Sequence, residues 1–444
     1  MRDEFYDIRD KRSREYGVVD KLSEAPVRVV VGDDAAECPR GQILFLSLVN
    51  LLSRFHRRLA LIVPRKKLVV RKALGRVSGS GNLDLHDAAV AIAQANDPFI
   101  SLDDRSESNH AIGIGLASKA DAPWFVSTND NIVQLANDPS PIDRADGFSL
   151  GPCLGACIAS WSLFQQVSGG TIKPQRISAW NLRDEEDAIA GPSSLGPLDV
   201  GRVLMLGAGG VGSCLAFWLS LVGVKGSWLV VDGDSAKLHN ANRSLGITAV
   251  DAGWPTGKGE EKARLAAELL GVQHRTCWHD ALSEDDYKVD LVLPLANERG
   301  VRTRVAMLGM PILLHATTSR NFEAQLHRHI PERDDCIICR LPKKDDPSAF
   351  KCAEVTIKGE EGSSDASLAF LSGAAGVMLA SALYRLASGE IAKEEHNWFR
   401  LAFRSVHRLA YRGNFACKMD CQGIPRSVRR ITQESSRWAC IDAV

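Results

Sequence analysis

The chain lacks net charge, because its 54 Lys and Arg residues are matched by 54 Asp and Glu residues. It therefore has no overall field to gather nucleic acid or anionic lipid, and we expect neither nucleic acid nor a membrane as partner. Long hydrophobic runs are also missing, since residues 43–52 and 367–386 are too short or too interrupted to face lipid. The opening segment carries carboxylates and lacks the apolar stretch of a secretory signal. We expect a soluble, cytoplasmic protein.

The eleven cysteines are expected to stay reduced there, so they favour metal ligands, core residues or a nucleophile over disulfides. With 45% hydrophobic and 24% charged residues the composition is that of a globular protein, and 444 residues predict two or three domains. The sharpest change in composition lies at residues 183–199, where a charge run meets glycine, proline and serine. We place a boundary there, between a first half at residues 1–190 and a second half at residues 191–444.

Strands and helices are predicted to alternate in both halves. In the second half, expected strands at 203–206 and 227–231 alternate with expected helices at 213–221 and 260–270. This pattern predicts an α/β fold with a doubly wound, mostly parallel sheet of the Rossmann type. The first half shows a similar alternation, with strands at 27–31 and 59–63 and near 111 and 124, and helices at 44–55 and 85–95. Its first strand leads into a turn without closely spaced glycines, so we expect a degenerate α/β half without a nucleotide site; two unrelated α/β domains are the alternative.

A glycine-rich turn in the pattern G-x-G-x-x-G follows the strand at 203–206. Its glycines are Gly207, Gly209, Gly210 and Gly212. Glycines let the backbone N–H groups at a helix N-terminus approach a phosphate chain. Asp232 lies twenty residues after Gly212, at the end of the next strand, where its carboxylate can bind ribose hydroxyls. Alone, this pattern predicts an adenine nucleotide, and an NAD or FAD dehydrogenase is the first alternative.

Cationic and polar side chains follow the predicted ribose carboxylate. Asp234, Asn240 and Arg243 come next, and Lys262 stands on the first turn of the following helix. Hydride transfer needs no cations near the phosphates, whereas breaking a phosphoanhydride bond builds charge on the leaving pyrophosphate. The glycine turn is not followed by Lys-Ser or Lys-Thr, so it is not a P-loop. The cations therefore favour ATP cleavage over dehydrogenation.

In this combination of motifs the chain resembles the ThiF-type adenylyltransferases, which include the sulfur-carrier activators and the ubiquitin-activating enzymes, over roughly residues 200–425. The resemblance implies a site for ATP and Mg²⁺. Its residues would be Gly207, Gly209, Gly210, Gly212, Asp232, Asp234, Asn240, Arg243 and Lys262. Because the segment before Lys262 is longer than the usual spacing in the family, Lys258 is the alternative lysine.

One position departs from the family pattern. The family's magnesium-binding aspartate follows a strand of the type D-L-V-L, and here Asn297 takes its place. A neutral amide binds Mg²⁺ less well than a carboxylate does. Either Asn297 still binds the ion, with help from Glu298 or Asp234, or adenylation is weak or lost.

Two cysteine pairs lie far apart in the second half. Cys336 and Cys339 form one pair, and Cys417 and Cys421 form the other, with a three-residue spacer. Four thiolates from two such pairs are a common tetrahedral Zn²⁺ site, and four unrelated cysteines are the alternative. The resemblance favours zinc, because family members often carry one pair before the crossover segment and one near the C-terminus.

Cys352 lies in a polar segment shortly after the first pair, next to Lys351, which would favour the reactive thiolate. The resemblance implies that a cysteine in the crossover loop, here residues 340–366, takes the acyl group as a thioester; a chance surface cysteine is the alternative. The remaining cysteines in apolar contexts are expected to be core residues. They are Cys153, Cys157, Cys214 and Cys277.

The spacing after Cys339 leaves no room for the separate catalytic-cysteine domain of the large ubiquitin-activating enzymes, and too few residues follow Cys421 for their C-terminal ubiquitin-fold domain. The chain instead resembles the minimal activating enzymes of bacterial ubiquitin-like conjugation operons, in which an inactive adenylation-like half precedes the active one. Family relatives also receive an arginine in the ATP site from a preceding segment. Candidates here are Arg9, Arg12 and Arg14, and a solvated, charged N-terminus explains them equally well.

The resemblance implies ATP-dependent adenylation of the C-terminal carboxylate of a ubiquitin-like protein, then thioester formation on the enzyme and transfer to a conjugating enzyme. A sulfur-carrier activator that stops at the acyl-adenylate is the alternative within the family. A catalytically inactive scaffold that binds nucleotide is a hypothesis from another functional class, and a nicotinamide oxidoreductase is a third. The sequence leaves the oligomeric state open, and a homodimer is one form that it allows.

Overall fold

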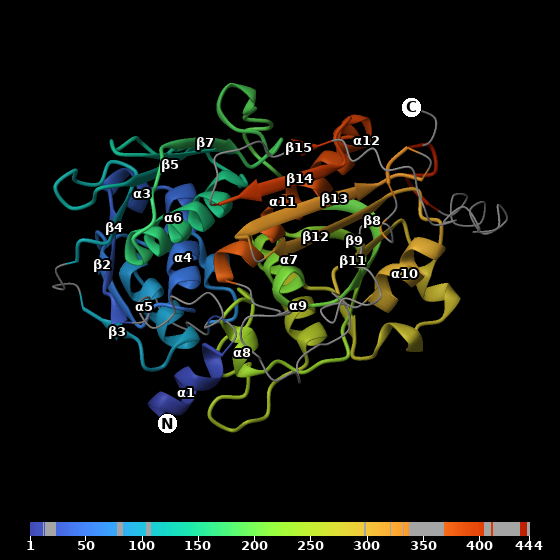
Figure 1. Cartoon of the computed structure of the whole chain (residues 1–444), viewed down its shortest axis with the longest axis horizontal. Helices are drawn as coiled ribbons and strands as arrows, with labels where there is room; N and C mark the ends of the chain where they lie inside the picture. The colour runs from blue at the N-terminus through green and yellow to red at the C-terminus, as the bar shows by residue number, and fades with distance from the viewer. Residues whose placement is uncertain are drawn as a thin grey trace.

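The computed structural model describes most of the chain (Figure 1). The described residues are 1–11, 13, 24–77, 83–103, 108–296, 299–319, 321–331, 333–335, 337, 368–403, 410–411 and 436–441. The first half, blue to teal in Figure 1, lies beside the second half, green to orange. Within the described residues the strands form a seven-stranded sheet and two four-stranded sheets.

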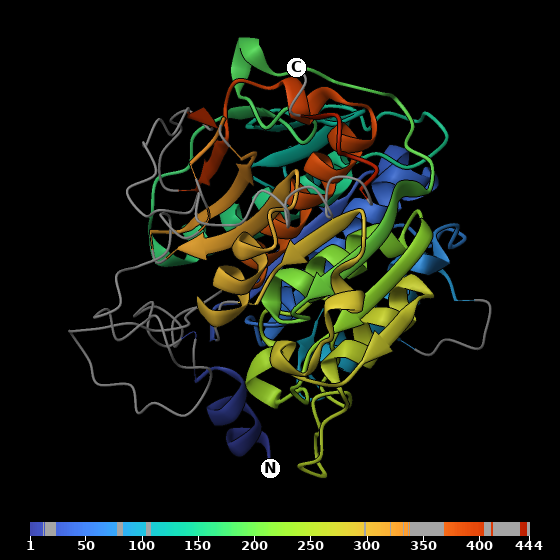
Figure 2. The same ribbon diagram turned by 90° about the vertical axis from the view of Figure 1, so that its right-hand side faces the viewer.

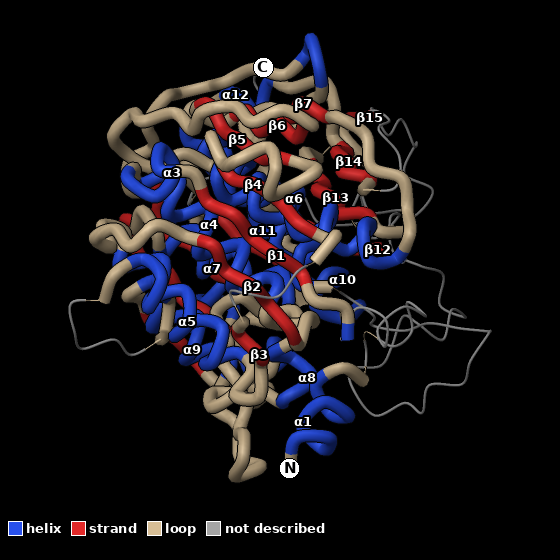
Figure 3. Tube along the Cα trace, turned by 90° about the vertical axis from the view of Figure 1, so that its left-hand side faces the viewer, coloured by secondary structure: helices blue, strands red, loops and turns tan. Residues whose placement is uncertain are grey.

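The first half is built on the seven-stranded sheet, in the order β3-β2-β1-β4-β5-β6-β7, which Figure 3 shows as a row of strands. The strands are β1 (Val27–Val31), β2 (Arg58–Ile62), β3 (Ser101–Leu102), β4 (Ala111–Ile114), β5 (Phe125–Asn129), β6 (Ile132–Ala136) and β7 (Gln175–Ser178). From β3 to β5 neighbouring strands run parallel, and β6 and β7 are antiparallel to their neighbours. The helices are α1 (Arg2–Arg9), α3 (Asp33–Glu37), α4 (Pro39–Leu52), η2 (Arg71–Leu74), α5 (Leu85–Asn96), α6 (Gly151–Ser168) and η3 (Glu185–Asp187).

The second half begins with a parallel sheet in the order β10-β9-β8-β11 and continues into an antiparallel sheet, β12-β13-β14-β15; both are prominent in Figure 2. The strands are β8 (Leu198–Leu206), β9 (Val224–Val231), β10 (Gln273–Arg275), β11 (Leu291–Pro294), β12 (Leu313–Ser319), β13 (Glu323–His329), β14 (Trp398–Ala402) and β15 (Ala410–Tyr411). The helices are α7 (Gly210–Ser220), α8 (Leu238–Ala241), α9 (Lys262–Leu270), η4 (His279–Ala281), η5 (Glu284–Tyr287), α10 (Arg299–Met307), α11 (Ala369–Ala387) and α12 (Glu390–Lys393).

The parallel parts of the two halves share one strand order. It is β3-β2-β1-β4 in the first half and β10-β9-β8-β11 in the second, and in each half antiparallel strands follow. The predicted α/β fold with a mostly parallel, doubly wound sheet is confirmed.

A hydrophobic core continues across the two halves. Helices α4 and α6 of the first half contact α11 of the second, and α11 packs along α7. The largest cluster of buried side chains accordingly includes residues from Val27 to Ile441. The boundary expected near residue 190 falls between β7 and β8 in the sequence, while the core extends to both sides of it.

Helix α11 is the central helix of this core. Among the described residues it alone is long and apolar enough to span a membrane, and its whole apolar stretch is buried inside the protein. Its glycines allow close packing: a Cβ atom on Gly373 would lie 3.0 Å from the Cys157 sulfur, and one on Gly376 would lie 3.0 Å from the backbone nitrogen of Leu215. The indole of Trp218 also donates a hydrogen bond to the Gly373 carbonyl, at 2.9 Å.

Candidate functional site

The glycine turn lies between the end of β8 and the start of α7. Gly207 has φ +105°, and a Cβ atom there would lie 2.5 Å from the backbone nitrogen of Ala296. A Cβ atom on Gly212 would collide with the Gly207 carbonyl oxygen. On Gly209, by contrast, a Cβ atom would meet no atom within 4 Å. Protein atoms therefore pack closely against Gly207 and Gly212, whereas the space beside Gly209 is open. An anion in this space could accept hydrogen bonds from the first N–H groups of α7.

Asp232, at the end of β9, fixes the turn to the neighbouring strand. Its carboxylate accepts the Ala208 N–H at 2.7 Å and the Asp234 N–H at 2.9 Å. Burial raises the pKa of Asp232, while the charge of Lys262 acts in the opposite direction. The carboxylate predicted to bind ribose thus lies against the turn predicted to bind phosphate.

Lys262, the first residue of α9, lies beside Asp234. Its ammonium is 2.6 Å from the Asp234 carboxylate, and its backbone N–H donates to the Asp234 carbonyl at 3.0 Å. Lys262 is buried, whereas the alternative, Lys258, is exposed in the loop before α9. The structure therefore brings Lys262, and not Lys258, to the carboxyl end of β9.

Asn240 and Arg243 lie in and just after α8. The Asn240 side-chain oxygen accepts the Lys237 N–H at 2.9 Å, so it caps the helix and is buried. The Arg243 side chain lies beside the start of α7, where its Cδ is 3.6 Å from the position of a Cβ atom on Gly210. Arg243 is thus next to the glycine turn, and Asn240 shapes the segment that carries it.

Residues 187–419 match the ThiF family. The chain belongs to the ThiF family. The comparison with curated proteins gave no match.

Solved structures of MccB from E. coli also resemble the chain. MccB with succinimide is 15% identical with a TM-score of 0.36, over 48% of this chain and 64% of MccB. MccB with MccA containing selenomethionine is 14% identical with a TM-score of 0.37, over 50% of this chain and 66% of MccB. The chain spans just under two thirds of the length of these MccB chains.

Two residues that the sequence analysis did not select lie next to the glycine turn or to the end of the neighbouring strand β9. A Cβ atom on Gly233 would lie 2.7 Å from the Trp278 ring, which stands just after β10 and is 47% exposed. Trp278 follows β10, the third strand of the second half, and this position in the sequence could have indicated that the ring lies near the strand ends. Ser372, near the start of α11, has its oxygen 2.9 Å from the position of a Cβ atom on Gly210. Only the tertiary fold could reveal Ser372, because it lies far from the turn in sequence.

The corresponding turn in the first half is filled by a side chain. After β1, the Asp34 carboxylate accepts the backbone N–H groups of Leu116 and Ile142, both at 2.9 Å. A Cβ atom on Gly32 would lie 2.6 Å from that carboxylate, and Asp34 itself is buried. The protein's own anion therefore occupies this turn, in keeping with the expected lack of a nucleotide site there.

Arg9, one of the three candidates for an arginine given to the ATP site, is neither solvated nor free to reach that site. It is fully buried and pairs with Asp10 and Asp97, each at 2.7 Å. Tyr6 packs on the same guanidinium, whose carbon lies 4.8 Å from the ring centroid. The amphipathic face of α1 is thus held to the first half by a buried ion-pair network.

Several predicted residues lie outside the described part of the chain, and their roles stay predictions. They are Arg12, Arg14, Asn297, Glu298, Cys336, Cys339, Cys352, Cys417 and Cys421.

The other cysteines are largely core residues, as expected. Cys153, Cys157 and Cys214 are buried, and burial raises the pKa of the Cys214 thiol to about 11. Cys277 differs, because it is only partly buried.

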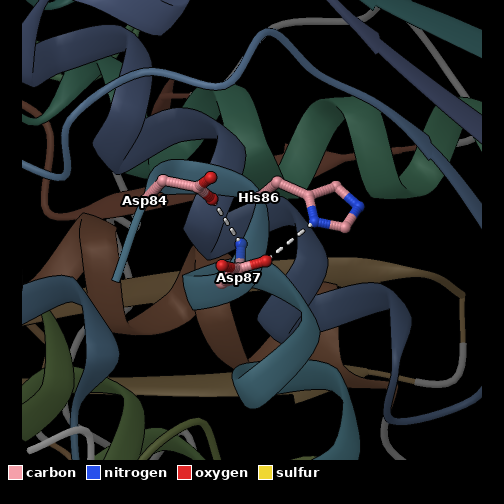
Figure 4. A group of neighbouring side chains, drawn as sticks. All are labelled: Asp84, His86 and Asp87. Atoms are coloured by element: carbon pink, nitrogen blue, oxygen red, sulfur yellow. Dashed lines mark hydrogen bonds and ion pairs between the residues drawn. The ribbon is translucent and has the colours of Figure 1, made fainter. Parts of the chain in front are cut away.

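Another group of possible metal ligands stands at the start of α5. Asp84, His86 and Asp87 lie close together there (Figure 4). Asp84 accepts the Asp87 N–H at 2.8 Å as the cap of the helix. Arg65 lies 2.7 Å from the Asp84 carboxylate and 3.1 Å from that of Asp87. Capping and this guanidinium account for the cluster without a metal.

Proposed function

We propose that the protein is an ATP-dependent adenylyltransferase. One observation carries the proposal: two cationic side chains lie beside the open glycine turn. Arg243 lies next to Gly210, the first residue of α7, and Lys262 lies at the carboxyl end of the neighbouring strand β9. A phosphate chain on the N–H groups of the turn would lie close to both cations. Hydride transfer leaves the phosphates unchanged and would not need these charges.

The reaction transfers AMP to a carboxylate. An oxygen of the substrate carboxylate attacks the α-phosphorus of ATP, the bond from that phosphorus to the bridging oxygen breaks, and pyrophosphate leaves. Arg243 and Lys262 stabilise the charge that grows on the phosphates. Since Lys262 is paired with Asp234 in the structure, ATP binding shifts the ammonium from the carboxylate towards a phosphate.

Mg²⁺ fits the acidic side of this site. The Asp234 carboxylate is about one third exposed at the strand end, and carboxylate oxygens suit a hard cation. We propose that Asn297, with help from Asp234 or Glu298, would hold the ion, which would neutralise phosphate charge.

The proposed substrate is the C-terminal carboxylate of a ubiquitin-like protein. The Cys352 thiolate then attacks the acyl carbon of the adenylate, the bond to AMP breaks, and AMP leaves. A conjugating enzyme takes the acyl group from the resulting thioester. The cytoplasm suits this chemistry, because a reducing compartment keeps the thiol free. An enzyme that stops at the adenylate is the alternative.

The arrangement of β13 and β15 supports the proposed zinc site, because each strand precedes one of the two cysteine pairs in the sequence. His327 on β13 pairs with Trp398 on β14, which pairs with Tyr411 on β15. The ends of β13 and β15 therefore reach the same edge of the sheet, about 10 Å apart. Cys336 follows β13 by seven residues and Cys417 follows β15 by six. Both cysteine pairs start within reach of one point, as one Zn²⁺ with four thiolates requires.

Calorimetric titration tests the proposed nucleotide. The wild-type protein should bind Mg·ATP and not NADH, and Lys262→Ala should weaken ATP binding about tenfold or more, because it removes a cation near the phosphates. Lys258→Ala is the matched control, since Lys258 is exposed in the loop, and should bind ATP as the wild type does. Tight NADH binding without ATP binding would refute the proposal.

A further inference from the structure

A buried arginine of the first half reaches into the segment that carries Arg243. Arg54 follows α4 and is 1% exposed. Its guanidinium donates to the carbonyl of Ala241 and, at 2.9 Å each, to the carbonyls of Leu245 and Ile247. These contacts join residues that are almost 200 positions apart in the sequence.

The same guanidinium is fixed from its own half by two asparagines. Its Nη2 donates to the side-chain oxygens of Asn50 at 2.7 Å and Asn96 at 3.0 Å, and its Nε donates to Asn50 at 3.1 Å. Burial lowers the pKa of Arg54 to about 9, so the side chain remains charged at neutral pH. Because the guanidinium is planar and donates to acceptors in both halves, its orientation is fixed, and it holds the backbone of the segment that carries Arg243 in place.

Two further side chains, one from α7 and one from the N-terminal segment, also bond to the supported segment. The Cys214 thiol on α7 donates to the Arg243 carbonyl at 3.6 Å, and the Asn242 amide donates to the Ser13 hydroxyl at 2.9 Å. The carbonyls of residues 241, 243, 245 and 247 are therefore all bonded to side chains from outside the segment. A shift of this backbone would move the Arg243 side chain away from Gly210.

We propose that Arg54 is a positioning residue for Arg243, through which the half without a glycine turn completes the nucleotide site of the other half. This inference rests on the proposed function, because it assigns Arg243 to the phosphates of ATP. It also gives the first half a role in nucleotide binding beyond the shared core.

The test compares Arg54→Met and Arg54→Lys with Arg40→Met. Arg40 is a matched control: it lies on α4, is fully buried, and bonds to Asp130, Asp143 and the carbonyls of Gly147 and Ser193, none of which belongs to the segment that carries Arg243. We measure the affinities for Mg·ATP and for adenosine by calorimetry and the melting temperature by differential scanning.

Arg54→Met should weaken ATP binding about tenfold and leave adenosine binding within about twofold, because Arg243 acts on the phosphates alone. Arg40→Met should lower the melting temperature but should not weaken ATP binding more than adenosine binding. Arg54→Lys should bind ATP better than Arg54→Met but less well than the wild type, because lysine keeps the charge and lacks the several fixed N–H donors of a guanidinium. If Arg54→Met does not fold, the comparison of Arg54→Lys with the wild type tests the inference.

The double variant Arg54→Met with Arg243→Ala shows whether Arg54 acts through Arg243. It should bind ATP no worse than Arg243→Ala alone. Additive losses, or equal losses for ATP and adenosine, would overturn the inference. A wild-type protein that binds no ATP would overturn the proposed function itself, whereas wild-type binding that Arg54→Met and Arg54→Lys leave unchanged would overturn this inference alone.

Discussion

Gly209→Ala should leave the fold intact and weaken nucleotide binding. Gly209 has φ −71° and ψ −155°, an extended conformation that alanine adopts without strain, and the new methyl group would meet no protein atom within 4 Å. Alanine restricts the unfolded chain and so stabilises the fold by about 0.4–1 kcal/mol. It is also a poorer N-cap than glycine for α7, which costs about the same amount. The net change in the free energy of unfolding should therefore stay within about 1 kcal/mol.

The methyl group would occupy the space that the account gives to phosphate. We expect the affinity for Mg·ATP to fall at least about tenfold, which corresponds to about 1.4 kcal/mol. Calorimetric titration and denaturant unfolding measure the two effects separately. Gly207→Ala is the contrasting variant, because φ +105° and the 2.5 Å approach to Ala296 should destabilise the fold as well. A Gly209→Ala protein with wild-type ATP affinity would show that phosphate does not bind at the open side of the turn.

Three other predictions address the rest of the chain. Burial alone would raise the pKa of Glu394, but hydrogen bonds from His396 and Arg385 lower it from 4.5 to about 2. Because this pKa is depressed in the folded state, its stabilisation is present above pH 4.5 and is lost as the pH falls towards 2. Glu394→Gln should lose about 3 kcal/mol at pH 7 and match the wild type near pH 2 in denaturant unfolding; an equal loss at both pH values would contradict this. Zinc should be found by elemental analysis at one ion per chain, and Cys339→Ser should lower zinc content and melting temperature more than ATP affinity. Cys352→Ala should abolish a dithiothreitol-sensitive adduct with the modifier on a non-reducing gel and leave pyrophosphate exchange intact; an adduct that survives would move the thioester elsewhere.

Local sequence patterns were sufficient for the elements that define the nucleotide site. The glycine spacing predicted the turn between Leu206 and Gly210, and the distance to Asp232 predicted the carboxylate that now lies against it. These features follow from the geometry of one strand, one turn and one helix. The choice between Lys258 and Lys262 needed the structure, because the loop before α9 is long enough to present either lysine.

Contacts between distant segments were not predictable in the same way. Arg54 and Ser372 have no local pattern that marks them. Arg54 reaches the segment of Arg243 because the helices of the two halves share one core, and Ser372 reaches Gly210 because α11 packs along α7. Arg9 was one of three candidates for an arginine given to the ATP site, with a solvated terminus as the alternative, and the fold shows a buried ion pair in its place. Its partner Asp97 is 88 positions away, so no local pattern could reveal the pair. The carboxylate of Asp34 in the turn of the first half is likewise a tertiary contact, with Leu116 and Ile142.

Isotope exchange between pyrophosphate and ATP tests the central claim most directly, because a reversible attack on the α-phosphorus returns labelled pyrophosphate to ATP. With a ubiquitin-like protein that has a free C-terminus, the wild-type enzyme should catalyse Mg²⁺-dependent exchange, and Arg243→Ala should reduce the rate about a hundredfold by removing charge stabilisation. Exchange that Arg243→Ala leaves unchanged, or a wild-type protein that binds ATP and the ubiquitin-like protein together without exchange, would contradict the assignment of adenylation to this site.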